Sequence, residues 1–255
     1  MTLFQAIILG IVQGLTEFIP VSSTAHLVFA ARAVGLFEGI EETLKAEQTT
    51  ATIAVIQLGT LLAVLVYFAR DIVNISRAFV VDHVALLRRP KARKLADDQA
   101  IGSKNSTSRL SHDAWLGWLV IVGSIPVGIV GLVLKKQIEG TFTKNLWVIA
   151  TMMIVVAILL AVAELVGKRN RSMEDLTIRD AIAVGLAQVL ALIPGSSRSG
   201  STIMGGLFAG LTRETAARFS FLLSIPAIAA SGLLELKEAL VKLPPALMDR
   251  WPSRP

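Results

Sequence analysis

The 255-residue sequence contains no cysteine, and only 17% of its residues are charged. Without cysteine the chain can form neither a disulfide framework nor a thiolate nucleophile or metal site. Ordinary soluble domains are about a quarter charged, whereas 53% of the residues here are hydrophobic. The net charge of +6 could by itself indicate nucleic-acid binding, but the long uncharged apolar runs argue against a water-soluble groove binder. We therefore predict a single membrane domain over residues 1–255, with no nucleic-acid partner.

Four apolar segments are long enough to cross a bilayer, because a spanning helix needs roughly 20 apolar residues. The second contains a Ser124-Ile125-Pro126 break, and the fourth contains Pro226. The pattern predicts an all-α, polytopic membrane protein. The predicted spans are residues 52–68, 115–134, 146–166 and 219–236.

Two further apolar stretches, residues 3–33 and 181–211, are interrupted by polar residues. Each half is too short to span a membrane alone, and such breaks are tolerated at membrane depth only where they line a cavity. We therefore predict two re-entrant helix pairs. The resulting plan is a first pair plus span over 1–69, a loop over 70–113, two spans over 114–166, a second pair plus span over 181–236, and a tail over 237–255.

The charged loops predict the orientation of the chain. Residues 70–113 contain nine lysines and arginines, which is typical of a solvated cytoplasmic loop; a lipid-headgroup or partner site is the alternative. Residues 167–171 (GKRNR) fit the same side, and the acidic residues 38–47 fit the outside. Lysines 135, 136 and 144 would then lie outside, against the trend. An odd number of spans separates the two broken stretches, which predicts that they are inverted repeats.

The two broken stretches also match in sequence. Residues 18–23 (FIPVSS) align with 192–197 (LIPGSS) at an offset of 174, and Gln13 aligns with Gln188 with a one-residue slip. So short a match could arise by chance, but it coincides with the predicted inversion. Interrupted hydrophobic segments in two inverted halves point to a binding site near the midplane of the membrane.

The chemistry expected at these breaks is anion binding. Pro20 and Pro194 each precede serines that can cap a new helix, and a helix N-terminus offers free N–H groups and partial positive charge. Arg198 adds a permanently charged planar fork suited to phosphate. A buried arginine in a membrane segment is a functional-site hypothesis by default, although Arg198 could instead extend to the membrane interface. Two such N-termini in a cavity predict a phosphate site.

The first break carries the acid–base groups. Gln13 and Glu17 are four residues apart and therefore share a helix face. Ser22 and Ser23 precede His26 by four and three residues, so one helical turn could bring a hydroxyl near the imidazole. A hydroxyl and an imidazole within reach of a carboxylate are the components of an activated nucleophile. The alternative for His26 is a core histidine with a satisfied hydrogen bond.

These motifs resemble a known family. Residues 13–26 (QGLTEFIPVSSTAH) are similar to the first signature of the undecaprenyl-diphosphate phosphatase, or bacitracin-resistance, family, and residues 194–202 (PGSSRSGST) to its second. Residues 56–59 (IQLG) and 219–223 (FSFLL) resemble it as well. The likeness covers about residues 1–236.

The resemblance implies a multi-pass hydrolase of the bacterial inner membrane with two re-entrant helix pairs and an active site facing the periplasmic side. Such an enzyme removes the terminal phosphate of undecaprenyl diphosphate, a polyprenyl diphosphate lipid. The product is the lipid carrier for peptidoglycan synthesis, and family members are associated with bacitracin resistance. A divalent cation, Mg²⁺ or Ca²⁺, is implied by the resemblance alone, since the sequence shows no complete set of metal ligands.

Residue roles carry over by position. Ser23 matches a proposed nucleophile, His26 a proposed base or alternative nucleophile, and Glu17 an acid that orients or deprotonates. Arg198 joins this catalytic group, while attack by Ser23, His26 or water stays open. The expected substrate-binding residues are Gln13, Ser22, Ser197, Ser199 and Thr202. Because glutamine cannot transfer protons, Gln13 would hold a water or a phosphate oxygen.

Two other functions stay open. Inverted repeats with broken helices are also transporter architecture, so the chain could be a lipid or small-molecule transporter or flippase. Family members usually continue for two more membrane helices beyond the segment that corresponds to residues 219–236. We therefore expect a shortened chain, which could be an inactive paralogue or could be complete only as a homo-oligomer.

Overall fold

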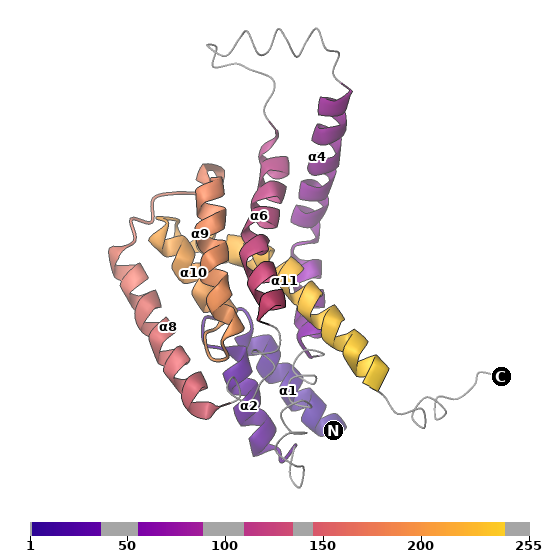
Figure 1. Ribbon diagram of the computed structural model, residues 1–255, viewed down its shortest axis with the longest axis vertical. Helices are drawn as coiled ribbons and strands as arrows, with labels where there is room; N and C mark the ends of the chain where they lie inside the picture. The colour runs from indigo at the N-terminus through magenta and orange to yellow at the C-terminus, as the bar shows by residue number, and fades with distance from the viewer. Residues whose placement is uncertain (1, 37–55, 89–109, 135–144, 243–255) are drawn as a thin grey trace, which may run out of the picture.

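A computed structural model describes residues 2–36, 56–88, 110–134 and 145–242 (Figure 1). Within these ranges the chain is helical and contains no β-strand, which confirms the all-α prediction. A helix over Ile56–Tyr67 follows α2. The remaining helices are α1 (Leu3–Thr16), α2 (Ser23–Ala33), α4 (Ala69–Leu87), α6 (His112–Val133), α8 (Leu146–Val166), α9 (Ile178–Val189), α10 (Arg198–Phe208) and α11 (Arg213–Lys242), with short 3₁₀ turns η2 (Met173–Asp175) and η3 (Leu190–Leu192).

Three of these helices are long and apolar enough to cross a membrane, namely α6, α8 and the Arg213–Leu234 part of α11. They coincide with three predicted spans, so the polytopic membrane class is confirmed. Pro126 and Pro226 lie inside α6 and α11, respectively, and neither ends its helix. The helix α11 also runs on to Lys242, so the first residues of the predicted tail are helical. Residues 243–255 lie outside the described part.

The loop prediction for residues 70–113 is wrong over its first half, because Ala69–Leu87 forms α4. This helix follows Ile56–Tyr67 at a bend of 72°, and residues 89–109 lie outside the described part. The face of α4 that carries Ile75 and Phe79 packs against Gly117 of α6, while Arg70 and Arg77 are exposed. Basic residues indicate which side of a membrane is solvated, but they do not exclude a helix that has an apolar face.

Both broken stretches form pairs of short helices, as predicted. α1 pairs with α2, and α9 pairs with α10. The 14 residues of α1 span about 21 Å, which is less than the roughly 30 Å of a bilayer core. The residue before each second helix, Ser22 or Ser197, has a positive φ of 63° or 53°. The second helix of each repeat therefore follows a serine with positive φ, although these two serines are 175 residues apart and not the 174 of the sequence match. The inverted orientation of the repeats stays a prediction.

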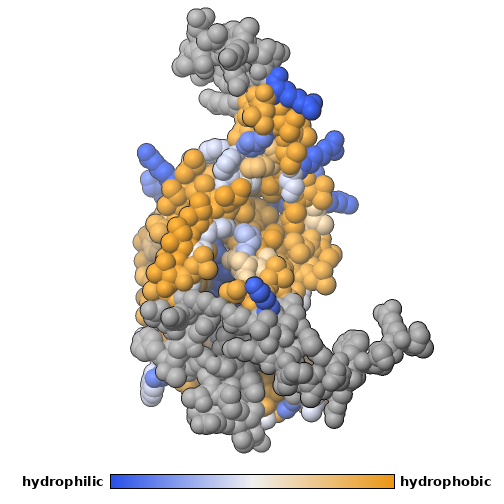
Figure 2. All heavy atoms as spheres, turned by 45° about the vertical axis from the view of Figure 1, so that its right-hand side comes forward, coloured by the Kyte–Doolittle hydropathy of each residue, from blue (hydrophilic) through white to orange (hydrophobic). Residues whose placement is uncertain are grey.

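The main hydrophobic core lies between α6, α8, α9, α10 and α11, and Phe219 and Leu223 are fully buried in it. Close backbone contacts bring these helices together: a Cβ on Gly185 of α9 would lie 2.3 Å from the carbonyl oxygen of Gly123 in α6. Apolar side chains dominate the described outer surface in Figure 2, as expected of a protein in lipid, and hydrophilic side chains are visible in a hollow of this face.

Candidate active site

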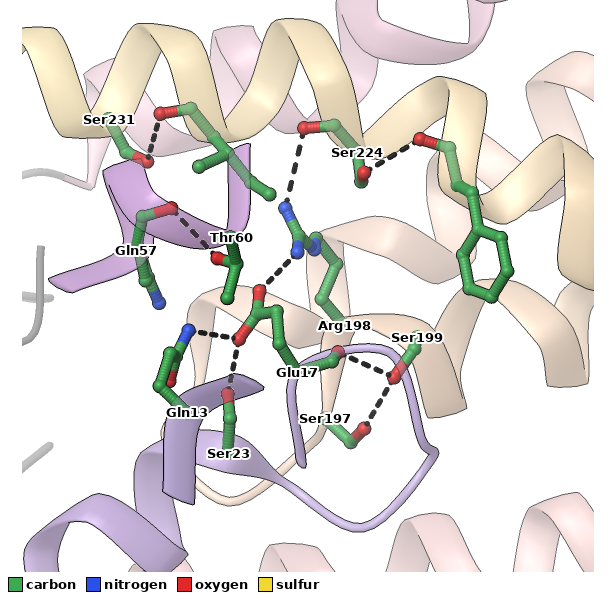
Figure 3. A network of polar contacts seen from close by, with 12 residues as sticks. Gln13, Glu17, Ser23, Gln57, Thr60, Ser197, Arg198, Ser199, Ser224 and Ser231 are labelled. Atoms are coloured by element: carbon green, nitrogen blue, oxygen red, sulfur yellow. Dashed lines mark hydrogen bonds and ion pairs between the residues drawn. The ribbon is translucent and has the colours of Figure 1, made fainter. Parts of the chain in front are cut away.

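The centre of the polar cluster is Glu17, which directly follows α1 and is 6% exposed. Its Oε2 accepts hydrogen bonds from Gln13 Nε2 at 2.7 Å and from Ser23 Oγ at 2.5 Å. Its Oε1 is ion-paired with the Arg198 guanidinium. Figure 3 shows Gln13, Ser23 and Arg198 arranged around this one carboxylate. The structure therefore brings four of the predicted site residues into direct contact.

Arg198 is the first residue of α10, and its side chain is 18% exposed. One nitrogen, Nη2, contacts Glu17, and the other, Nη1, donates to the carbonyl oxygen of Ser224 in α11 at 3.4 Å. The guanidinium is therefore held by acceptors from the end of α1 and from α11. A charge buried in this way is stable only when it is paired and hydrogen-bonded, and Glu17 provides that partner.

Both helix N-termini converge on the same carboxylate. Ser23 is the first residue of α2 and Arg198 is the first residue of α10, and the side chains of both contact Glu17. Each N-terminus carries partial positive charge and N–H groups that have no partner within the helix. An anion placed here would meet two helix N-termini and one guanidinium, so the geometry is suited to binding phosphate.

The hydroxyls of the second break hold α10 in place. Ser199 Oγ, which is buried, lies 3.0 Å from the carbonyl oxygen of Ile19 and 3.3 Å from that of Glu17. Thr202 Oγ1 is 2.5 Å from Ser220 Oγ in α11 and also donates to backbone carbonyls of its own helix. These two hydroxyls are therefore engaged by protein partners, although the sequence suggested substrate contacts for them.

The other serine of the second break, Ser197, caps its helix. Its Oγ accepts from the backbone N–H of Gly200 at 3.1 Å and lies 3.2 Å from Ser199 Oγ. Ser22 holds the equivalent position in the first break, but its side chain makes no capping bond. Ser22 as a whole residue is 2% exposed.

The expected contact between a serine hydroxyl and His26 is not the one that forms. Ser23 bonds to Glu17, and His26 Nδ1 lies 2.8 Å from the carbonyl oxygen of Ser22. As the residue before α2, Ser22 directs its carbonyl at the first turn of the helix, where it also accepts from the backbone N–H of His26 at 3.3 Å. If Nδ1 donates to this carbonyl, Nε2 is left as the proton-accepting nitrogen. The nearest proton acceptor for Ser23 is thus Glu17.

Polar residues from two further helices border the site, and sequence analysis assigned them no role. Thr60, which is 6% exposed, donates to the carbonyl of Gln57 at 2.8 Å. Figure 3 places both residues beside Gln13 and Glu17. The carbonyl of Ser224 holds Arg198 from the other side. The IQLG and FSFLL motifs end one residue before Thr60 and Ser224, so the available signal was the position of these two residues next to the motifs.

Three buried polar atoms have no hydrogen-bond partner among the described residues: Gln13 Oε1 and both amide atoms of Gln188. An unpartnered buried amide group costs roughly 1–3 kcal/mol in protein contexts. Gln13 Oε1 lies at the site and can accept a hydrogen bond from a water or a ligand. The same part of the chain contains no group of three or more histidine, aspartate and glutamate side chains placed to hold a metal.

Fold and site together define a polytopic membrane protein with a buried acid–base cluster at two convergent helix N-termini. Comparison with protein families gives this class a narrower identity. The family model described as bacitracin resistance protein BacA matches residues 6–250. The chain belongs to this family.

Curated relatives carry a common name. A protein of Syntrophobacter fumaroxidans called undecaprenyl-diphosphatase is 52% identical over 240 residues, which is 94% of this chain and 78% of the relative. One of the same name from Mycolicibacterium vanbaalenii is 48% identical, with 94% and 75% covered. An undecaprenyl-diphosphatase 2 of Streptomyces avermitilis is 45% identical, with 94% and 76% covered. The chain thus spans about three quarters of each relative's length.

Proposed function

We propose that this protein hydrolyses undecaprenyl diphosphate to undecaprenyl phosphate and inorganic phosphate. The reaction recycles the lipid carrier for peptidoglycan synthesis and thereby confers resistance to bacitracin. The observation that carries the proposal is the contact of the Ser23 hydroxyl with a carboxylate, Glu17, that is itself paired with Arg198. Membership of the family and the names of the relatives support the choice of substrate. A transporter would not need an activated hydroxyl, so this contact favours hydrolysis.

In the first step Ser23 Oγ attacks the terminal phosphorus atom. The new Oγ–P bond forms as the bridging P–O bond of the diphosphate breaks, and undecaprenyl phosphate leaves with the bridging oxygen. Glu17 Oε2, 2.5 Å from Oγ, accepts the serine proton. Arg198 and the N-termini of α2 and α10 stabilise the negative charge that develops on the equatorial phosphate oxygens.

In the second step water hydrolyses the phosphoserine. The water oxygen bonds to phosphorus, the Oγ–P bond breaks, and Ser23 regains its proton from Glu17. His26 Nε2 takes a proton from the attacking water, because the Ser22 carbonyl occupies Nδ1. The buried acceptor Gln13 Oε1 orients the water or a protonated phosphate oxygen. This division of roles uses the two candidate bases at different steps.

The expected location is the bacterial inner membrane, with the site open to the outer face. The support comes from the two ends of α8. A Cβ on Gly195, beside the N-terminus of α10, would lie 2.3 Å from the carbonyl oxygen of Ile149 near the start of α8. The basic residues 167–171 follow the other end of α8. They begin beside the end of α10, since a Cβ on Gly167 would lie 2.7 Å from the carbonyl oxygen of Leu207, which is about 14 Å along α10 from Arg198. If the basic residues are cytoplasmic, the site lies toward the opposite face.

The resemblance also implies a divalent cation, whose oxygen ligands would have to come from the residues of this cluster. The cluster offers one carboxylate, Glu17, which Arg198 already neutralises, and one free carboxamide oxygen on Gln13. Mg²⁺ takes about six oxygen ligands and Ca²⁺ takes six to eight. These residues alone do not form such a site, and no step above depends on one. Phosphate release measured with a chelator and with added Mg²⁺ or Ca²⁺ tests the implied dependence.

The proposal is tested by phosphate release from undecaprenyl diphosphate with purified protein in lipid nanodiscs. Ser23→Ala removes the nucleophile and should lower kcat by at least about 1,000-fold. Ser231→Ala is the matched control, because the only partner of the Ser231 hydroxyl among the described residues is the carbonyl of Ile228 in its own helix. Wild-type protein that releases no phosphate, or Ser23→Ala protein as active as the control, would contradict the proposal.

A further inference from the structure

The carboxylate of Glu17 lies where the groups best suited to phosphate converge. Its side chain is 4% exposed, and it contacts the first residue of α2, Ser23, and the first residue of α10, Arg198. Both carboxylate oxygens are engaged, and both Nη atoms of Arg198 have acceptors. The anion site is thus already occupied by an anion that belongs to the protein.

We propose that Glu17 is an internal competitor of phosphate for Arg198, in addition to its role as a base. The substrate's terminal phosphate displaces the carboxylate from the guanidinium, and the carboxylate returns to Arg198 after hydrolysis and expels inorganic phosphate. This competition rests on the proposed function, because the proposed function identifies the competing anion as the phosphate of the substrate or product. The competition gives Glu17 a second role, the control of anion affinity, which its role as a base does not require.

The exchange conserves the contacts of the carboxylate on its other side. When Oε1 gives up Arg198, Oε2 keeps the hydrogen bonds from Gln13 Nε2 and Ser23 Oγ, so the carboxylate stays beside the nucleophile. Arginine pairs with carboxylate and phosphate through the same planar fork, and phosphate offers more acceptor oxygens. Phosphate can therefore replace Glu17 at Arg198, while the presence of Glu17 keeps the affinity for a small product low.

Binding of inorganic phosphate, measured by titration calorimetry, tests the competition without any turnover. Glu17→Gln keeps the shape of the side chain and removes its charge, so it should bind phosphate at least tenfold more tightly than wild type while being inactive. Glu17→Ala should show the same gain, which guards against an effect peculiar to glutamine. Glu174→Gln changes the net charge equally at an exposed position and should leave phosphate binding unchanged.

The gain must depend on Arg198. In an Arg198→Gln background, adding Glu17→Gln should improve phosphate binding less than twofold, because there is no guanidinium left to release. A gain that persists in this background would indicate a general repulsion between charges and would overturn the competition. So would Glu17→Gln and Glu17→Ala proteins that unfold at the wild-type temperature yet bind phosphate no more tightly.

The experiments distinguish a failure of the hydrolysis proposal from a failure of the competition proposal. Wild-type protein that hydrolyses the lipid diphosphate, with a Glu17→Gln variant that gains no phosphate affinity, refutes only the competition. Wild-type protein that releases no phosphate from the lipid, with a Glu17→Gln variant that gains Arg198-dependent affinity, refutes only the hydrolysis and leaves the competition standing.

Discussion

The two polar breaks have the same backbone and different chemistry. Each has a serine with positive φ, Ser22 or Ser197, immediately before a helix that begins at the site. The first break supplies the carboxylate Glu17 and the second supplies the guanidinium Arg198. Ala191 and Leu192, which lie 174 and 175 residues after Glu17, provide no second carboxylate. A repeated backbone thus provides two anion-binding N-termini, and a few side chains divide the acid–base and charge-binding work between them.

Within the second break, the largest expected effect comes from removing the charge of Arg198. Arg198→Ala should lower kcat/KM by about 100–1,000-fold, because developing phosphate charge loses its clamp. It should also destabilise the fold by about 3–5 kcal/mol, since Glu17 is left as a buried charge without a cation. Phosphate release and thermal unfolding measure the two effects. An Arg198→Ala protein with an unchanged unfolding temperature would show that the pair is not buried in solution.

The next effect concerns the backbone of the second break. Gly195 has a φ of +99°, and a Cβ there would lie 2.3 Å from the Ile149 carbonyl oxygen. Gly195→Ala should therefore lower the free energy of unfolding by about 2–4 kcal/mol, through the strained backbone and the clash together. Gly14→Ala in α1 is the control, because no atom of the described residues lies within 4 Å of a Cβ at that position. It should be neutral or stabilising by up to about 1 kcal/mol.

A smaller effect should follow from removing the hydrogen bonds that link the two breaks. Ser199→Ala removes the hydrogen bonds from α10 to the carbonyls of Glu17 and Ile19, which should cost about 1 kcal/mol of stability. Since the same bonds align Arg198 with Glu17, we expect kcat to fall about tenfold with little change in KM. Steady-state kinetics beside a Ser231→Ala control test this. A change of kcat and KM by the same factor, or no change in either, would contradict an aligning role for Ser199.

The smallest expected effects come from the two glutamines that align between the repeats, Gln13 and Gln188, and they differ from each other. Gln188 has two buried amide atoms without a described partner, so Gln188→Leu should change stability by less than about 1 kcal/mol and leave kcat unchanged. Gln13 donates to Glu17 at 2.7 Å, so Gln13→Leu should lower kcat by about tenfold. Activity and unfolding of the two variants, measured side by side, test this asymmetry. Equal losses would mean that Gln188 binds something essential, such as an ordered water.

The parts of the site that local sequence determines were predictable. New helices do begin where serines follow Pro20 and Pro194, since Ser22 and Ser197 are the residues before α2 and α10. The polar residues Glu17, Ser23 and Arg198 stood out because they interrupt apolar runs. The partner of His26 was not predictable, because the first turn of α2 offers the imidazole both a hydroxyl and the Ser22 carbonyl, and the Ser23 hydroxyl bonds to Glu17 instead.

Features that depend on packing between distant segments were also missed. Charge density suggested a loop where α4 forms, because the sequence does not reveal that Gly117 of α6 accommodates the side chain of Phe79. Thr60 and the carbonyl of Ser224 reach the site only through tertiary packing (Figure 3). A main-chain carbonyl leaves no trace in side-chain motifs, so its contribution emerges only from coordinates.

The ion pair at the centre of the site joins residues 181 positions apart. During synthesis, Glu17 enters the membrane long before Arg198 exists, and until then Gln13 and Ser23 are the described partners that can satisfy it. Closing so long a loop comes late in folding. The enzyme therefore acquires its anion site only after the second break has been inserted, and an incompletely synthesised chain has the nucleophile but lacks the charge that would make it work.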